Sequence, residues 1–285
     1  MFDLVVVGHV THDLEGENGA WRPGGTVSYA ARVAVDLGLK VAVVTAARTL
    51  DGFEEVFRGA ELFCLPSSRT TSFRNVYRGG IRRQLMPERA RSIRVADLPA
   101  VVRDARTALL GPVAAELPWS MAKAFSASTR VSACLQGWLR SVDPVDRRVQ
   151  PLSARSVRSR SLGGLFAVFL SREDLGDSVS EGEVAPWLSR VGNLLITDGE
   201  RGATVLSGRS RATVPAHPAD ASDPTGAGDT FAAAFLARYL ERGDSADAAL
   251  YASAAASMMV EQEGIGRLDR REVDRRHRAL AALTG

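Results

Sequence analysis

The sequence is poor in lysine and cysteine, and these shortages exclude some classes of protein. Lys40 and Lys123 are its only lysines, so arginine carries almost all of its positive charge. The arginines are spread along the chain and the formal net charge is only +3, whereas nucleic-acid binding usually needs a clustered basic patch. Cys64 and Cys134 are far apart in apolar surroundings, so we expect a reduced, cytoplasmic setting and no disulfide framework.

Long apolar runs and internal repeats are also absent. No stretch approaches the roughly 20 apolar residues of a membrane span. The N-terminus lacks the basic-then-apolar layout of a signal peptide. We therefore expect neither a membrane nor a nucleic acid as a partner. The 285 residues, 45% of them hydrophobic, suffice for one large α/β domain or two modest ones.

Short apolar runs rich in β-branched residues predict a buried, mostly parallel sheet. They cover residues 2–8, 41–46, 108–113, 130–135, 165–170 and 194–196. Helical patterns cover residues 27–37, 231–242, 245–260 and a charged terminal stretch, 268–285. Residues 143–161 are rich in Arg and Ser without a period, and we expect a loop and a helix there.

A β-hairpin is predicted where the α/β pattern is interrupted. Two alternating runs, residues 70–78 and 81–86, are joined by Gly79-Gly80, which is typical of a two-residue hairpin loop. Alternation puts Phe73, Asn75 and Tyr77 on one face. A solvated edge hairpin is an equally good interpretation of each residue taken singly.

The most informative stretch is Asp223-Pro-Thr-Gly-Ala-Gly-Asp-Thr230, which precedes a helical pattern ending at Gly243. A glycine turn that opens a helix offers unpaired N–H groups and a positive dipole end, and both attract an anion. A carboxylate at the same place, Asp229, could take a proton while the amides hold developing negative charge. The alternative is a plain glycine turn in which Asp229 and Thr230 cap a core helix.

Other polar residues follow predicted strands, where ligands bind in open α/β sheets. Thr11 and Asp13 follow the first strand, and Gln136 follows the run at 130–135. A turn residue is an equally good interpretation of Asp13. His9 and His12 could suggest a metal pair, but no third ligand is spaced nearby.

The octet at 223–230 resembles the C-terminal signature of the ribokinase, or pfkB, family of sugar and nucleoside kinases. The resemblance covers nearly the whole chain in order. It implies one domain over residues 1–285, a three-layer αβα sandwich with a mostly parallel sheet and a small β lid. The lid would be formed by inserted segments at about 10–23 and 70–96, and a homodimer through the lid is possible.

The resemblance also implies phosphoryl transfer from ATP to a hydroxyl of a small polyol, sugar or nucleoside. Asp229 would be the general base, and backbone amides of the turn beyond Gly226, including Ala227 and Gly228, would form the anion hole. Magnesium would bridge the ATP oxygens. The ATP-binding residues implied by the matching segments are Thr197, Gly199, Gly202, Thr225 and Gly264.

Two further segments correspond to parts of the family pattern that are associated with ions. The family commonly has Asn-x-x-Glu after the strand at 165–170, tied to magnesium through water, and this chain has Ser171 and Asp174 there. Asp174 is thus a candidate outer-shell magnesium residue or a helix cap. The loop at 261–267 resembles one that flanks adenine and, in some members, a monovalent cation such as K⁺.

The residues that the resemblance implies for acceptor binding are Thr11, Asp13, Gly24, Gly25, Asn75, Arg83 and Gln136. The family often has Asn where this chain has Tyr29, which argues against ribose. The stretch at 70–84 looks most like lids of the inositol-kinase-like branch. We therefore expect a cyclitol or related polyol first and a nucleoside second.

Other function classes fit less well. A dinucleotide oxidoreductase would need Gly-x-Gly-x-x-Gly after the first strand, where Gly8 stands alone, and a P-loop kinase would need a Gly-Lys pair, which the sequence lacks. A non-catalytic ligand-binding regulator on the same fold is the remaining alternative, and the intact Asp229 argues against it.

Overall fold

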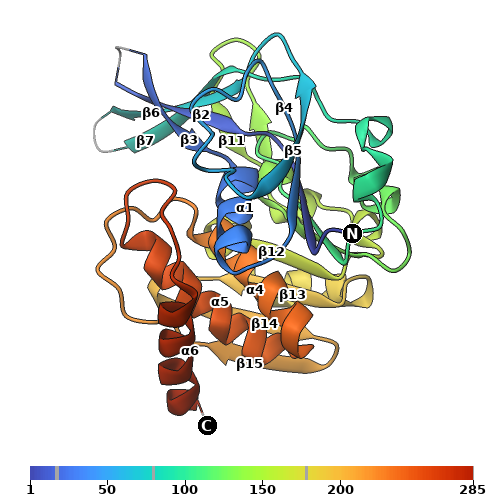
Figure 1. Ribbon diagram of the computed structural model, residues 1–285, viewed down its shortest axis with the longest axis vertical. Coiled ribbons are helices and arrows are strands. Elements are labelled where there is room, and N and C mark those ends of the chain that lie inside the picture. The colour runs from blue at the N-terminus through green and yellow to red at the C-terminus, as the bar shows by residue number, and fades with distance from the viewer. Residues whose placement is uncertain (17–18, 79–80, 177–178, 285) are drawn as a thin grey trace.

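The computed structural model describes residues 1–16, 19–78, 81–176 and 179–284. Within them, a nine-stranded sheet has the order β15-β14-β13-β12-β9-β8-β1-β4-β5 (Figure 1). All neighbours from β13 to β5 are parallel, and β14 and β15 are antiparallel additions. The strands are β1 Leu4–Val7, β4 Val41–Ala47, β5 Ala60–Pro66, β8 Thr107–Leu110, β9 Arg130–Cys134, β12 Ala167–Ser171, β13 Asn193–Thr197, β14 Ala203–Ser207 and β15 Ser210–Val214.

The two faces of this sheet are covered differently. Long helices cover one face: α1 Thr26–Asp36, α4 Ala227–Arg242, α5 Ser245–Val260 and, packed on α5, α6 Arg270–Thr284. The other face is covered by short elements: α2 Arg172–Leu175, α3 Glu181–Val184 and the 3₁₀ turns η1 Val95–Asp97, η2 Ala100–Val102, η3 Trp119–Ala124, η4 Gln136–Leu139, η5 Ala154–Ser156, η6 Ser159–Leu162 and η7 Ala185–Ser189. Alternate residues of each strand enter the two cores, as Val6 and Val7 do. The predicted three-layer architecture is therefore confirmed.

A second sheet, with order β3-β2-β6-β7, lies at the upper left of Figure 1. Its strands are β2 Thr11–Glu15, β3 Ala20–Gly24, β6 Thr71–Arg78 and β7 Ile81–Glu88. We call it the lid sheet. The predicted hairpin is confirmed as β6–β7, although its Gly79-Gly80 loop lies outside the described residues. β2 pairs with β6 in parallel, so two inserted segments share one small sheet.

The expectation of a loop and a helix at residues 143–161 is wrong. A short hairpin of β10 Arg140–Val142 and β11 Val149–Pro151 is present, followed by η5 and η6. Asp143 closes its turn, because its carboxylate accepts hydrogen bonds from the amides of Val145 and Asp146. A bridge between Leu85 and Arg148 attaches this hairpin to β7, and that long-range contact has no local sequence signal.

The strand order reverses between β1 and β8, and ligand sites of open α/β sheets form at such points. Gly8 and Gly111 end these strands in such close contact that a Cβ on Gly8 would lie 2.2 Å from the Gly111 carbonyl oxygen. Beyond Gly8 the chain passes directly into β2 of the lid sheet. In the described part of the chain, no helix combines the length and apolar character needed to cross a bilayer.

Candidate active site

The glycine turn at residues 223–230 leads into α4 as predicted. Gly226 is the residue before the helix and has a left-handed backbone, with φ 79° and ψ 0°. No side chain caps this helix start. The Ala227 amide donates a 3.3 Å hydrogen bond to the Pro224 carbonyl, while no hydrogen bond of the Gly228 or Asp229 amide is found among the described residues. Two amides at the positive end of a four-turn helix are thus available to an anion.

The two glycines of the turn are required for different reasons. At Gly226, the left-handed φ disfavours other residues, and a Cβ would lie 2.2 Å from two ring carbons of Tyr29. At Gly228, nothing lies within 4 Å of the position that a Cβ would take. The protein itself therefore leaves open the space that a side chain at position 228 would occupy.

Asp229 lies in the first turn of α4 with a partly buried side chain. Burial raises the pKa of its carboxyl to about 6, and the negative charges of Asp174 and Asp13 contribute. A hydrogen bond with the Thr26 hydroxyl and the positive charge of Arg140 act in the opposite direction and lower the pKa. A carboxyl with these neighbours exchanges a proton near neutral pH.

Asp13 is brought close to Asp229 from the lid sheet. The Thr11 hydroxyl donates a 3.0 Å hydrogen bond to Asp13 Oδ1. A Cβ on Gly24 would lie 2.4 Å from Asp13 Oδ2, and one on Gly25, where φ is 89°, would lie 2.6 Å from the His9 carbonyl oxygen. The double glycine therefore lets the start of α1 pass directly beside β2 and its carboxylate.

Strand register separates the two lid candidates. Asp13 lies beside Phe73, so Asp13, Phe73 and Asn75 share a face of the lid sheet. Asn75 lies opposite Gln84, whose amide donates to it at 3.4 Å, whereas Arg83 lies opposite Val76. Arg83 therefore lies on the other face from Asp13 and Asn75, and the predicted grouping of Arg83 with them has no geometric support.

Two arginines that the sequence analysis did not select lie among these acids. Arg140 lies 5.9 Å from the centre of the Phe73 ring. Burial raises the pKa of both Asp13 and Asp229, and the positive charge of Arg140 acts against that rise. Arg22 lies directly opposite Asp13 in the β2–β3 pair and 3.7 Å from the Asp223 carboxylate. Their positions gave a usable signal, since Arg22 precedes Pro23-Gly24-Gly25 and Arg140 closely follows Gln136. Gln136 itself is exposed at the start of η4.

The segments expected to bind the donor lie along the C-terminal ends of β12 and β13. Thr197 ends β13 beside Ser171, and Gly199 begins the 3₁₀ turn η8 Gly199–Arg201. A Cβ on Gly202 would lie 2.0 Å from the Val214 carbonyl oxygen, so close packing on β15 accounts for that glycine.

Asp223 joins the turn at 223–230 to the loop at 261–267. Its carboxylate accepts a 2.9 Å hydrogen bond from the Thr225 amide and a 3.2 Å hydrogen bond from the Gly264 amide. These bonds and the charge of Arg22 outweigh burial and lower its pKa. The two segments that carry Thr225 and Gly264 are therefore held together.

Asp174 forms a capping box at the start of α2, which was the alternative to a magnesium role. Its Oδ2 accepts from the Ser171 amide at 2.8 Å, and its own amide donates to Ser171 Oγ at 3.0 Å. Its other carboxylate oxygen has no hydrogen bond among the described residues. Among the described residues, no group of three or more His, Cys, Asp or Glu side chains is arranged to hold a metal ion. A single carboxylate oxygen of this kind is what magnesium takes where substrate phosphates and waters supply its other ligands.

The two early histidines have different surroundings. The ring nitrogens of His9 lie 2.8 Å from the Arg91 carbonyl oxygen and 2.8 Å from Thr71 Oγ1. The His12 ring stacks on Trp21 with their centroids 3.7 Å apart. His9 therefore has a partner at each ring nitrogen, whereas His12 has a stacking partner and its buried Nε2 has no hydrogen bond among the described residues.

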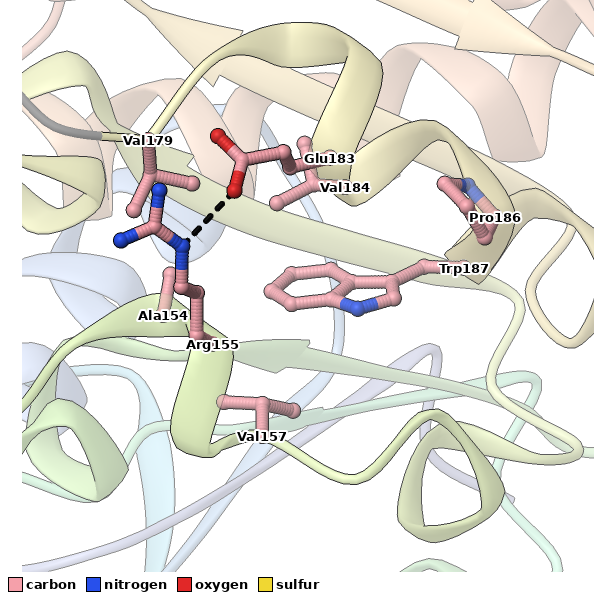
Figure 2. Close-up of a pocket in the computed structure, with 8 residues that line it drawn as sticks. All are labelled: Ala154, Arg155, Val157, Val179, Glu183, Val184, Pro186 and Trp187. Atoms are coloured by element: carbon pink, nitrogen blue, oxygen red, sulfur yellow. Dashed lines mark hydrogen bonds and ion pairs between the residues drawn. The ribbon is translucent and has the colours of Figure 1, made fainter.

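A cavity of about 350 Å³ lies away from these residues (Figure 2). It is lined mainly by apolar side chains from η5, α3 and η7, and an ion pair between Arg155 and Glu183 spans it. Trp187 and Val184 in its wall are almost fully buried. None of the candidate site residues lines it.

Comparison with known proteins finds sequence similarity to kinases over part of the chain. Residues 150–270 match the family model of pfkB family carbohydrate kinases. A nucleoside kinase of Methanocaldococcus jannaschii is 35% identical over 83 residues, which are 29% of this chain and 28% of that protein. A ribokinase of Bacillus subtilis is 40% identical over 67 residues, 24% of this chain and 23% of that protein. The matched segments span roughly a quarter of these curated relatives.

Solved structures match over almost the whole chain. A pyrophosphate-dependent myo-inositol-1 kinase converted into a myo-inositol-3 kinase has a TM-score of 0.80 and 21% identity, covering 95% of this chain and 98% of its own. A ribokinase from Thermotoga maritima has a TM-score of 0.73 and 18% identity, covering 98% and 100%. The fold is therefore ribokinase-like. Over residues 150–270, the chain is also similar to pfkB family carbohydrate kinases.

Proposed function

We propose that the protein is an ATP-dependent kinase that transfers the γ-phosphoryl group to a hydroxyl of a small polyol, sugar or cyclitol. The observation that carries this proposal is the start of α4. There, two amides without partners among the described residues adjoin a carboxyl whose pKa is raised to about 6. An anion hole and a base side by side are what transfer of a phosphoryl group to an alcohol needs.

In this proposal, Asp229 takes the proton of the reacting hydroxyl. At pH 7–8 a carboxyl with a pKa of about 6 is mostly ionised, and it is still a better base than an ordinary aspartate. The Gly228 and Asp229 amides hold the negative charge of the transferring group. Magnesium bound to the donor would neutralise phosphate charge, and Asp174 would hold one of its waters.

The lid side of the site would hold the acceptor. Asp13, whose pKa is raised mainly by burial, would accept hydrogen bonds from the hydroxyls of the acceptor, and the positive charge of Arg140 offsets the charges of Asp13 and Asp229. Asn75 shares the face of Asp13 and is the lid residue we retain as an acceptor contact. We leave Arg83 out because it lies on the opposite face.

Nucleosides are the second candidate acceptors, since two of the curated relatives are nucleoside kinases. The experiment is a coupled assay with Mg²⁺ in which myo-inositol, ribose and adenosine are offered with ATP, and then with pyrophosphate. We expect ATP-dependent phosphorylation of at least one polyol. Binding of ATP and a polyol without any transfer would instead favour the non-catalytic regulator.

A further inference from the structure

Arg172 joins three segments that meet beyond the C-terminal ends of β12 and β13. Ser171 and Thr197 are paired where these two parallel strands end. Arg172 follows as the first residue of α2, and its Nε lies 3.9 Å from Asp198 Oδ2 in the segment expected to bind the donor. Its Nη2 donates a 2.6 Å hydrogen bond to Oε1 of Glu181, the first residue of α3. One guanidinium group therefore contacts carboxylates from two other segments.

Asp198 is fixed within its own turn. Its carboxylate accepts hydrogen bonds of 2.9 and 2.7 Å from the Arg201 guanidinium, and its amide receives the Gly202 carbonyl as an acceptor at 2.7 Å. These bonds close residues 198–202 on themselves, and none of them reaches α2. The ion pair with Arg172 is the contact that ties this carboxylate to α2.

Glu181 anchors Arg172 from the other side. Its Oε1 also accepts a 3.4 Å hydrogen bond from the Thr204 hydroxyl of β14, and its Oε2 accepts one of 3.3 Å from Arg211 of β15. Only 25% of the Glu181 side chain and 35% of the Arg172 side chain are exposed, so water screens their ion pair incompletely. A carboxylate with three donors holds the Arg172 guanidinium in one place.

The position of Arg172 matters because Asp174 belongs to the same short helix. α2 has four residues, and a helix of that length depends on contacts with its surroundings. If Arg172 moved away from Asp198, the Asp174 carboxylate would move relative to the turn at 197–202. A plain surface ion pair is the alternative, and it would leave nucleotide binding unchanged.

We propose that Arg172 is a positioning residue for the phosphate donor. It holds α2 and the Asp174 carboxylate against the turn at 197–202, so that both segments are in place when Mg²⁺-bound ATP arrives. This inference rests on the proposed kinase function and adds a residue to its donor half.

Arg172→Gln and Arg211→Gln form a matched pair of variants. Both side chains bind Glu181, but only Arg172 also contacts Asp198 among the described residues. With the acceptor that is phosphorylated in the assay above, Arg172→Gln should raise the KM of Mg²⁺-ATP about three- to fivefold, the effect of one partly exposed ion pair. Its kcat and the KM of the acceptor should stay within about twofold. Arg211→Gln should keep the wild-type KM of ATP, and an equal KM of ATP in wild type and Arg172→Gln would overturn the proposal.

A double-mutant cycle with Asp198→Asn tests the contact itself. If Arg172 acts through Asp198, the KM of ATP in the double variant should rise by less than the product of the two single effects. Single effects that simply multiply would overturn the proposed route from Arg172 to the donor turn.

Hydrogen exchange tests the positioning role without turnover. In the protein without nucleotide, the amides of residues 198–202 should exchange about threefold faster in Arg172→Gln than in wild type or Arg211→Gln. Unchanged exchange together with a raised KM would make Arg172 a direct contact of the donor and overturn the positioning role.

If wild type transfers phosphate to none of the acceptors, the proposed function has failed, and calorimetry with Mg²⁺-ATP then tests Arg172 alone. Binding to Arg172→Gln about three- to fivefold weaker than to wild type would support its role. Equal binding, or no binding of ATP to wild type, would overturn it.

Discussion

The phosphate turn and the lid hairpin differ in how much of their arrangement is local in sequence. In the turn, residues 223–230 place the left-handed glycine, two amides and the carboxylate within one contiguous stretch. In the lid, the residues that face Asp13 depend on the pairing of β6 with both β2 and β7. The chemistry of the proposed reaction is therefore local in sequence, whereas acceptor selection depends on strand register.

The largest expected effect is at the base. Asp229→Asn should keep the shape of the turn and lower kcat by about 10²- to 10⁴-fold, the usual contribution of a positioned general base. ATP affinity should change little, and steady-state kinetics with calorimetry measure both. Asp274→Asn on the remote helix α6 is the control. Turnover of Asp229→Asn within a few-fold of wild type would leave Asp229 as a cap only.

Substitutions of the two glycines of the turn should have different effects, one on activity and the other on folding stability. Gly228→Val has room in the protein, so it should fold normally but lower kcat by about 10²-fold or more, because its side chain occupies the space of the phosphate. Gly226→Ala should lose about 2 kcal/mol or more of folding stability, because its backbone is left-handed and its Cβ meets Tyr29. Denaturant unfolding and kcat together separate the two. Full activity of Gly228→Val would place the phosphate elsewhere.

A matched pair of variants tests which face of the lid sheet contacts the acceptor. Asp13→Ala should lower the kcat/KM of the acceptor by about 10²-fold, since it removes charged hydrogen bonds at about 1.5–3 kcal/mol each. Arg83→Ala, on the opposite face, should change it less than about threefold. Both variants should leave the KM of ATP nearly unchanged. Equal losses in the two would mean that the face of the lid sheet does not decide acceptor contact.

Periodicity and turn residues were sufficient to predict most of the fold from the sequence. The parallel strands, the four long helices and the β6–β7 hairpin have strong local sequence patterns, and the structure confirms these elements. The β10–β11 hairpin was missed because the bridge from Leu85 to Arg148 holds it against β7. Arg22 and Arg140 lie near predicted site segments in the sequence, but their proximity to Asp13 and Asp229 depends on how β3 and β10 pack in the folded protein. Dimerisation through the lid stays a prediction.

A pH-dependent effect on stability is also expected at Asp229. Because burial raises the pKa of Asp229 in the folded state, its ionisation opposes folding. This destabilisation is absent below the ordinary pKa near 4, grows between about pH 4 and 6, and is complete above about 6. Asp229→Asn should therefore stabilise the protein by up to about 3 kcal/mol at pH 8 and by much less at pH 4. Urea unfolding at the two pH values measures this, and a gain that does not depend on pH would contradict it.

The most direct test of the central claim, that Asp229 is a partly buried base beside the anion turn, is the pH dependence of kcat at saturating substrates. The pKa of about 6 predicts that kcat falls tenfold per pH unit below about 6 and is level from about 7 to 8. Asp229→Asn should lose this acid limb together with most of its rate. A wild-type profile that stays level down to pH 4.5, or an unchanged limb in Asp229→Asn, would show that another group accepts the proton.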